Sequence, residues 1–354
     1  MTLAHGHDQM KIRQDIRDLS FKELAEELKD LGEPSYRAGQ VFDWLYKRGA
    51  VTFDAFTDLP KSLRLRLEER FSLESLELVE RLVSADKTEK LLFRLADGNF
   101  IESVLIPAGN RNTLCLSTQV GCKFGCSFCA SGRGGLKRNL RPSEILGQVL
   151  FLRDKLSLHL TNLVFMGMGE PLDNYDNGIK AIQIMNDSRG LGIAARRITI
   201  STVGIVPGIE RLKALGLQLH LSLSLHAVRE ELRSKLLPVS RKYPLPKVLQ
   251  ACQDYVRETG RMMTLEYILL RGLNDSAEDA SRLASIARRL RAKVNLIPCS
   301  PVPGLDFFPP PAETNRLFLR WLKEKGVKAT LRRSKGAEIQ AACGQLAGKM
   351  GKET

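Results

Sequence analysis

The 354-residue sequence contains no apolar run that approaches the roughly 18 residues needed by a membrane-spanning helix, so we expect no membrane span. Its first stretch, MTLAHGHDQMKIRQD, lacks the apolar core of a signal peptide. The seven cysteines are odd in number and unevenly clustered, which favours metal or redox chemistry over a disulfide framework. These absences together predict a cytoplasmic protein.

Aromatic residues make up only 6% of the chain and hydrophobic residues 43%, which is an ordinary globular composition rather than a fibrous or disordered one. The length allows a sizeable core and suggests two or three structural units. Acidic residues number 40 against 54 basic ones, which gives a net charge of +14. This excess favours a polyanionic partner such as nucleic acid or an anionic membrane, although a soluble basic enzyme would also carry it.

Three regions differ in their pattern of apolar residues. Residues 1–72 indicate a small helical accessory domain, because segments such as DLSFKELAEELKDLG (18–32) have helical apolar spacing and end in glycine. Residues 73–107 contain short strand patterns separated by turn residues, which predict a small antiparallel β extension. Residues 108–354 alternate between strand and helix patterns.

This alternation predicts an α/β fold with a parallel sheet, closed or partly closed into a barrel. In such folds the chemistry lies at the carboxyl ends of the strands. The strand candidates are 113–119, 161–167, 197–202, 219–225, 264–270, 293–298 and 327–333, and the helix candidates are 142–156, 177–187, 207–216, 245–260, 277–291 and 314–326.

Three cysteines follow the first of these strands in the stretch GCKFGCSFCASG (121–132), at positions 122, 126 and 129. A structural zinc site would need a fourth cysteine or histidine, and none lies in this loop or in the next 25 residues. Thiol exchange would need only Cys126 and Cys129, which leaves Cys122 unexplained. Three thiolates on a four-iron cluster leave one iron open to a small molecule. A cluster is the favoured interpretation, with zinc and unrelated cysteines as alternatives.

The spacing C-x3-C-x2-C, with Phe128 just before the third cysteine, resembles the radical S-adenosylmethionine (SAM) superfamily. The resemblance implies a partial (β/α)6 radical SAM barrel, a 4Fe-4S cluster on Cys122, Cys126 and Cys129, and SAM as a cofactor. FMGMGEP (165–171) resembles the segment that receives the amino group of SAM. His226 has an alternative interpretation as a structural, hydrogen-bonding histidine. The candidate SAM contacts from these strand ends are Gly169, Glu170, Ser201, Ser224, Leu225 and His226.

A further cysteine, Cys343, lies near the end of the sequence in AEIQAACGQLAG, flanked by small residues. Together with FIESVLIP, TLCLSTQVGCKFGCSFCASG, KRNL, GMGEP, STVGIVP, SLSLHA and NLIP, this segment resembles the RlmN/Cfr group of radical SAM RNA methyltransferases. The resemblance extends over nearly the whole chain, including SYRAGQVFDWLYKRG and TDLPKSLR in the helical region. ACGQL is its most discriminating element.

This resemblance implies a sequence of reactions at an adenine ring carbon, which is too electron-poor to attack SAM directly. Cys343 first takes a methyl group from one SAM by displacement. The cluster then cleaves a second SAM, and the resulting 5′-deoxyadenosyl radical removes hydrogen from the Cys343 methyl group. The methylene radical adds to adenine, Cys115 resolves the adduct and ends in a disulfide with Cys343, and Glu102 is the candidate proton acceptor.

One position departs from the family pattern. After the strand NLIP, where relatives commonly carry an asparagine that contacts SAM, this chain has Ser300, which is shorter and lacks the amide group. We expect Ser300 at the cofactor site, although without the paired donor and acceptor of an amide. Cys252 and Cys299 are interpreted as structural.

The resemblance implies 23S ribosomal RNA and, for the RlmN branch, a tRNA anticodon-loop adenine as substrates, with an electron donor for the cluster. The length of the N-terminal region and the ordinary composition favour methylation at C2. No stable protein partner is inferred. The alternatives are Cfr-type methylation at C8, a radical SAM enzyme that acts on a protein or small molecule, and a zinc-stabilised RNA-binding module. The basic excess suits RNA, whose phosphates dominate affinity. The candidate phosphate contacts are Lys137, Arg138, Arg196, Arg197, Arg332, Arg333 and Lys335.

Overall fold

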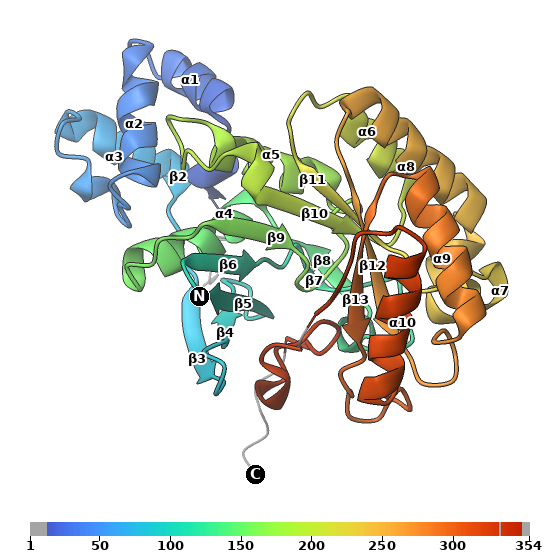
Figure 1. Cartoon of the computed structure of the whole chain (residues 1–354). Coiled ribbons are helices and arrows are strands. Elements are labelled where there is room, and N and C mark those ends of the chain that lie inside the picture. Colours follow the sequence, from blue (N-terminus) through green and yellow to red (C-terminus); the bar gives the residue numbers. More distant parts are fainter. Residues whose placement is uncertain (1–12, 333, 349–354) are drawn as a thin grey trace, which may run out of the picture.

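The computed structural model describes residues 13–332 and 334–348, so Arg333 lies outside the described residues. Figure 1 shows a helical unit from the first part of the chain beside a large twisted sheet that carries helices on its outer side. Across the described ranges, no helix combines the length and the apolar character needed to cross a membrane.

The first unit contains three helices: α1 (Phe21–Asp30), α2 (Tyr36–Tyr46) and α3 (Lys61–Arg70). Two short parallel strands, β1 (Gln14–Asp15) and β2 (Phe71–Ser72), bring its ends together. Helix α1 begins at a capping box, in which Ser20 and Glu23 each bond the backbone N–H of the other. Leu24 and Leu28 of α1 are fully buried, which explains the helical spacing of apolar residues in the sequence.

The main sheet has ten strands in the order β14-β13-β12-β11-β10-β9-β6-β5-β4-β3. Four of them form an antiparallel part: β3 (Glu77–Val83), β4 (Glu89–Arg94), β5 (Phe100–Ala108) and β6 (Arg111–Cys115). The others continue in parallel from β6: β9 (Asn162–Phe165), β10 (Ile198–Thr202), β11 (His220–Ser224), β12 (Thr264–Leu269), β13 (Lys293–Pro298) and β14 (Ala329–Leu331). Because β3 and β14 are both edges, the sheet is open, and the expected partial barrel is confirmed.

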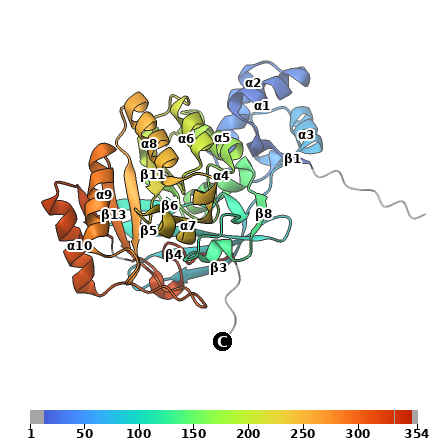
Figure 2. The same cartoon turned by 90° about the vertical axis from the view of Figure 1, so that its right-hand side faces the viewer.

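Helices connect the parallel strands and cover one side of them. Figures 1 and 2 show α6, α8, α9 and α10 along this outer side. Their bounds are α4 (Pro142–Leu150), α5 (Tyr175–Asn186), α6 (Val206–Lys213), α7 (Glu230–Leu236), α8 (Leu245–Thr259), α9 (Ala277–Arg289) and α10 (Ala312–Glu324). Two helices differ from the sequence prediction. Helix α7 was not expected, and the helix expected at 142–156 is α-helical only in α4 and then continues as a π-helical turn, η4 (Phe151–Lys155).

The strand expected at 113–119 is interrupted. After β6 ends at Cys115, the chain pairs separately in a two-stranded antiparallel ribbon of β7 (Gln119–Gly121) and β8 (Leu136–Asn139). The cysteine loop is the connection between these two ribbon strands, and it contains a 3-10 turn, η3 (Ala130–Gly132). The loop is therefore closed at its base by strand pairing, which the apolar pattern alone did not indicate.

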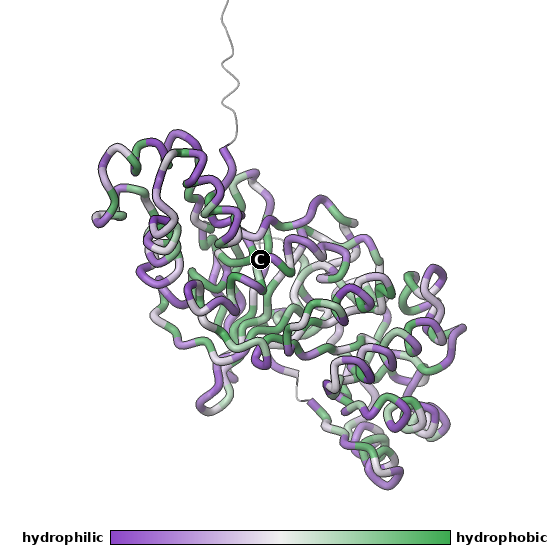
Figure 3. The backbone as a smooth tube through the Cα atoms, turned by 90° about the horizontal axis from the view of Figure 1, so that it is seen from above, coloured by the Kyte–Doolittle hydropathy of each residue, from purple (hydrophilic) through white to green (hydrophobic). Residues whose placement is uncertain are grey.

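One hydrophobic core joins the helical unit to the sheet, and it includes Leu63 of α3, Phe165 of β9 and Phe318 of α10. Figure 3 shows hydrophobic residues concentrated along the strands in the middle of the molecule, with hydrophilic ones along the outer helices.

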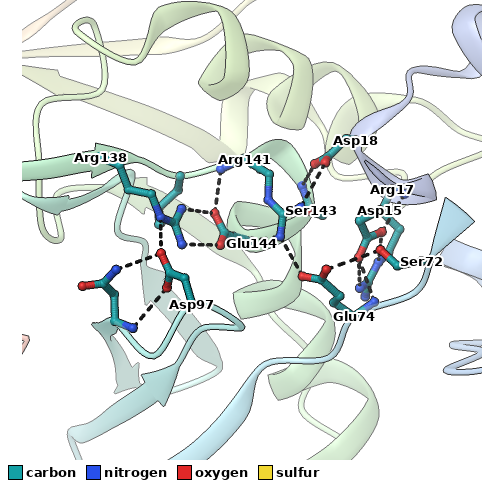
Figure 4. Close-up of polar contacts among 12 residues, drawn as sticks. Asp15, Arg17, Asp18, Ser72, Glu74, Asp97, Arg138, Arg141, Ser143 and Glu144 are labelled. Atoms are coloured by element: carbon teal, nitrogen blue, oxygen red, sulfur yellow. Dashed lines mark hydrogen bonds and ion pairs between the residues drawn. The ribbon is translucent and has the colours of Figure 1, made fainter. Parts of the chain in front are cut away.

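Polar contacts also fix the helical unit to the first turn of α4 (Figure 4). The Ser143 backbone N–H donates to Asp18 Oδ1 at 2.8 Å, and Arg141 Nη2 donates to Glu74 Oε2 at 2.6 Å. Glu74 in turn donates its backbone N–H to Asp15 Oδ2 at 2.9 Å.

Candidate active site

A cavity opens at the carboxyl ends of the parallel strands, where the α/β pattern predicted the chemistry. It brings together residues from eight separate segments. Of the residues predicted from sequence, those that line it are Cys126, Cys129, Gly169, Glu170, Ser201, Ser224, His226 and Cys343. Those that do not line it are Cys122, Glu102, Cys115, Leu225 and Ser300.

The three loop cysteines lie close enough to influence one another. Burial raises the pKa of Cys122 to about 12 and that of Cys126 well above its ordinary value, and the neighbouring thiols add to both increases. Buried thiols with raised pKa values become thiolates when a metal cation is present. No group of three or more His, Cys, Asp or Glu side chains in 13–332 and 334–348 is arranged to hold one metal ion. The loop supplies three thiolates where a closed structural zinc site uses four ligands, so its donor set fits a polynuclear cluster with one open iron better than a single zinc ion.

Glu170 is buried at the base of the cavity and holds two loops together. Its Oε1 accepts a hydrogen bond from Leu172 N at 3.1 Å, and its Oε2 accepts one from Val203 N at 2.9 Å, after β10. Burial raises its pKa to about 7, although these bonds act in the opposite direction. Gly169 has φ of 95°, and a Cβ there would lie 2.5 Å from Gln119 Cβ, so only glycine fits. Through these hydrogen bonds, the Glu170 side chain fixes the backbone of its own loop and that of the loop after β10.

Ser201 and Ser224 end neighbouring strands, and their hydroxyl oxygens lie 3.3 Å apart. Leu225 is fully buried and donates its backbone N–H to Glu266 O at 3.0 Å. His226 has φ of 58°, and its Nδ1 accepts a hydrogen bond from Ile268 N at 3.1 Å. Burial lowers the pKa of His226 to about 3, so the ring is neutral and carries its proton on Nε2.

The segment that carries Cys343 is tied to the cysteine loop. Ala130 N donates to Gly344 O at 2.7 Å, and Ser131 Oγ donates to Leu346 O at 2.6 Å. The Cys343 side chain is exposed, and it lies in the wall of the cavity. The surrounding protein raises the pKa of the Cys343 thiol, whereas the charge of Arg332 lowers this pKa. Cys343 therefore faces the same space as Cys126 and Cys129 and can be reached from solution.

Glu102 and Cys115 lie behind this segment. Glu102 Oε1 pairs with Lys90 Nζ at 3.2 Å, and its Oε2 accepts hydrogen bonds from Ala347 N at 2.7 Å and Gly348 N at 2.9 Å. Cys115 is buried, and burial raises its pKa to about 12, with the nearby Cys343 contributing.

The disulfide expected between Cys115 and Cys343 is not formed, because all seven cysteines are free in this structure. Cys252 and Cys299 are buried away from the cavity wall. Ser300 is buried as well, and its Oγ donates to Ser334 Oγ at 3.2 Å instead of facing the cavity.

The basic residues predicted as phosphate contacts lie in different environments. Arg332 lines the cavity. Arg138 is paired with Asp97 and Glu144, while Arg196 and Arg197 are exposed. Lys137 Nζ donates to Asn99 Oδ1 at 2.9 Å and Lys335 Nζ to Pro107 O at 3.4 Å.

Sequence reasoning missed Glu266, a buried carboxylate of β12 in the cavity wall. A signal was present, because Glu266 is the one charged residue in the strand pattern TLEYILL.

Comparison with known proteins agrees with this geometry. Residues 116–284 match the family model of the Radical SAM superfamily. The open parallel sheet and the three-cysteine loop at its carboxyl edge thus define the class: this is a radical SAM protein.

Residues 14–73 match the model of the ribosomal RNA large subunit methyltransferase N-terminal domain. The chain is 48% identical over 346 residues to a protein of Moorella thermoacetica named as a probable dual-specificity RNA methyltransferase RlmN, covering 95% of this chain and 98% of the relative. A Bacillus cytotoxicus protein of the same name is 45% identical over 341 residues, covering 96% and 94%. The crystal structure of a radical SAM methyltransferase from Sphaerobacter thermophilus superposes with a TM-score of 0.90 at 45% identity, covering 95% of this chain and all of that one.

The chain belongs to the RlmN family of radical SAM RNA methyltransferases. It is an enzyme, and its cofactors are a 4Fe-4S cluster and SAM.

Proposed function

We propose that this enzyme acts in the cytoplasm and methylates C2 of an adenine in 23S ribosomal RNA and of an adenine in the tRNA anticodon loop, by way of a methylated Cys343. The observation that carries the proposal is the position of the Cys343 thiol, which faces the same cavity as Cys126 and Cys129. The names of relatives at 45–48% identity support the RNA substrates. The net charge of +14 supports a polyanionic partner.

Cys343 acts as the nucleophile that accepts a methyl group, since its thiol is accessible and flanked by small residues. Cys122, Cys126 and Cys129 would hold the cluster, which, when bound and reduced by an external electron donor, would supply the electron for reductive cleavage of SAM. The chain's own contribution is to hold the Cys343 methyl group against this space.

The residues around the cavity bind and orient SAM. Gly169 presents its backbone to the amino group, while Ser201, Ser224 and His226 offer hydroxyl and imidazole groups from neighbouring strand ends. Glu170 and Leu225 hold the backbone in place through their hydrogen bonds. Ser300 acts indirectly, through its bond to Ser334.

Cys115 resolves the covalent link between protein and RNA. Burial raises the pKa of the Cys115 thiol to about 12, so this thiol loses its proton as its sulfur attacks the Cys343 sulfur. The bond between the Cys343 sulfur and the methylene carbon breaks, and the carbon keeps the electron pair and takes a proton. A transient disulfide results, which must be reduced before the next turnover. Glu102 accepts the ring proton only after it has released Ala347 and Gly348, because both of its oxygens are engaged in this structure.

Each of the three regions of the chain has its own role in the proposed reaction. Residues 1–72 form an accessory domain that contacts RNA, which the family match of 14–73 supports. Residues 73–107 form the β extension that supports the Cys343 segment, as the bond between Ser84 Oγ and Glu338 Oε1 at 2.8 Å suggests. Residues 108–354 form the radical SAM core.

Mass spectrometry of adenosines from ribosomal RNA and tRNA, incubated with SAM and anaerobically reconstituted enzyme, tests the proposal. We expect 2-methyladenosine. Appearance of 8-methyladenosine would show that the enzyme methylates C8 instead of C2. Absence of any methylated adenosine, when the cluster is active, would contradict the proposal.

The Cys343→Ala variant separates the steps of the reaction. It should lose RNA methylation by at least about 1,000-fold while it still cleaves SAM reductively, because the cluster ligands are unchanged. Full turnover by this variant would favour a radical SAM enzyme with another kind of substrate.

A further inference from the structure

Glu266 is the buried carboxylate of the cavity that has no assigned task. It lies in β12, its side chain is 4% exposed, and it forms part of the cavity wall. Its Oε1 accepts a hydrogen bond from Asn295 Nδ2 at 3.1 Å, whereas its Oε2 is buried without a hydrogen-bond partner among residues 13–332 and 334–348. Burial raises the pKa of Glu266, while Arg332, Asn295 and Ser222 act in the opposite direction, and no hydrogen bond from these residues reaches Oε2. An unpartnered buried oxygen is costly, which points to a ligand that donates to it.

The neighbours of Glu266 indicate the chemistry of that ligand. Glu266 pairs with Ser224 of β11 in the sheet register, and Ser224 lies beside Ser201 of β10. Two hydroxyls and one carboxylate thus form a polar row across three adjacent strands, all in the cavity wall. Ile268 and Ile297 provide an apolar wall nearby. A polar row next to an apolar wall matches a nucleoside, whose sugar carries neighbouring hydroxyls and whose base is flat and apolar on its faces.

A carboxylate is well suited to the sugar hydroxyls, because it accepts hydrogen bonds and offers none. The acidic residue that bonds the ribose in dinucleotide-binding folds follows the same logic. The side-chain amide of Asn295 fixes Oε1 and so orients the carboxylate, which leaves Oε2 as the free acceptor.

We propose that Glu266 is a specificity-determining residue that accepts a hydrogen bond from a ribose hydroxyl of SAM through Oε2, with Ser201 and Ser224 beside it. This inference rests on the proposed function, which places SAM in this cavity. The ribose of the target adenosine in RNA carries the same chemistry, so the experiment must separate the two sources.

The test measures binding of S-adenosylhomocysteine, which cannot be cleaved, to the reconstituted holoenzyme by isothermal titration calorimetry. Wild type and Glu266→Gln are each titrated with this ligand and with its 2′-deoxy and 3′-deoxy forms. In wild type, loss of the bonded hydroxyl should weaken binding about 10- to 100-fold, the range expected for a hydrogen bond to a charged group. Glu266→Gln should weaken binding of the parent ligand by a similar factor and should no longer discriminate the deoxy forms.

Glu144→Gln is the matched control, since it also removes a buried carboxylate but lies in α4 and pairs with Arg138. It should leave the affinity unchanged. If Glu266→Gln does not fold, Asn295→Ala is the second variant. It keeps the carboxylate, removes the bond that orients it, and should reduce discrimination about 3- to 10-fold.

Equal binding of all three ligands by wild type, or equal weakening of all three by Glu266→Gln, would overturn the inference and leave the proposed function standing. Failure of wild type to bind S-adenosylhomocysteine at all would contradict the proposed function itself. A loss that depends on Glu266 and appears only with a 2′-deoxy target adenosine in RNA would assign the carboxylate to the RNA ribose and overturn its assignment to SAM.

Discussion

His226 shows how burial and one hydrogen bond decide the chemical state of a single residue. Its ring is enclosed by Phe128, whose centroid lies 5.1 Å away at nearly a right angle, and its Nδ1 accepts from Ile268 N. Both contacts favour the neutral ring, because a protonated imidazole would lose the acceptor and would carry a charge into the interior. The sequence suggested two roles for His226, and the structural role is visible in these contacts.

A dependence of stability on pH follows from the lowered pKa of His226. The folded-state pKa is about 3 against an ordinary value of 6.5, so the unfolded chain binds this proton more readily. The contribution to stability is therefore full above pH 6.5 and is lost as the pH falls toward 3. We expect the free energy of unfolding of wild type to fall by up to about 1.4 kcal/mol per pH unit more than that of His226→Asn in this range.

Asparagine suits this comparison because it tolerates positive φ and retains an acceptor. Urea unfolding at about pH 4.5 and 6.5 measures the difference between the two proteins. Identical pH slopes would show that His226 does not titrate as its burial requires.

Among the structural elements, the ribbon of β7 and β8 fixes the cysteine loop, because it closes the base of this loop. Its geometry depends on Gly121, where φ is 77° and a Cβ would lie 2.0 Å from Gly135 O. The adjacent Cys122 donates its backbone N–H to this same oxygen at 3.0 Å. The position of one proposed cluster ligand thus depends on the close approach of two backbone segments.

Gly121→Ala should impair cluster assembly. A side chain there meets backbone and adopts a left-handed conformation that costs about 1–2 kcal/mol, so the ribbon must open. We expect the iron and sulfide content after reconstitution to fall by at least half. Gly134→Ala in the same loop is the control, because its Cβ would meet nothing within 4 Å. Equal cluster content in the two variants would contradict this account of the loop.

For the whole molecule, the attachment of the helical unit to the sheet domain combines two kinds of contact. One is the partly buried network around α4, in which Arg141 bonds Glu74 and Ser143 bonds Asp18. The other is the more exposed pair of Lys180 and Glu23 at 2.7 Å. Arg141 is about as exposed as Lys180, but it also lies near the buried carboxylates of Asp18 and Glu144, which would lose this cationic neighbour. The exposed Glu23 can exchange Lys180 for water at little cost.

Arg141→Ala should therefore destabilise the attachment by about 1–3 kcal/mol. Lys180→Ala should change it by less than about 1 kcal/mol. Hydrogen exchange of the amides in α1–α3, followed by mass spectrometry, would report faster exchange in the first variant. If both variants exchange equally, the network around α4 is not what fixes this unit.

Much of the fold could be predicted from the sequence because strand and helix patterns are local. The seven strands expected in residues 108–354 are present, since each is a short apolar run between helical patterns. The interruption after Cys115 was not predicted, because it depends on the pairing of Gln119 in β7 with Asn139 in β8. The π-helical turn after α4 was not predicted, because the apolar spacing of a helix does not distinguish i→i+4 from i→i+5 hydrogen bonds. The direction of side chains could not be predicted from the sequence either. Only the structure shows that Ser300 bonds Ser334 and that Arg332 lines the cavity.

The sequence by itself determined the charge of the chain, the alternation of its elements and the spacing of three cysteines, all of which are properties of neighbouring residues. Only the tertiary structure decided that the Cys343 segment lies against the cysteine loop, as in the bond between Ser131 and Leu346, 215 positions apart. It also decided that Glu102 is engaged, while Oε2 of Glu266 is buried with no hydrogen-bond partner in the part of the chain that the structure describes. Such contacts result from the packing of the whole sheet, whose long-range pairings no local pattern encodes.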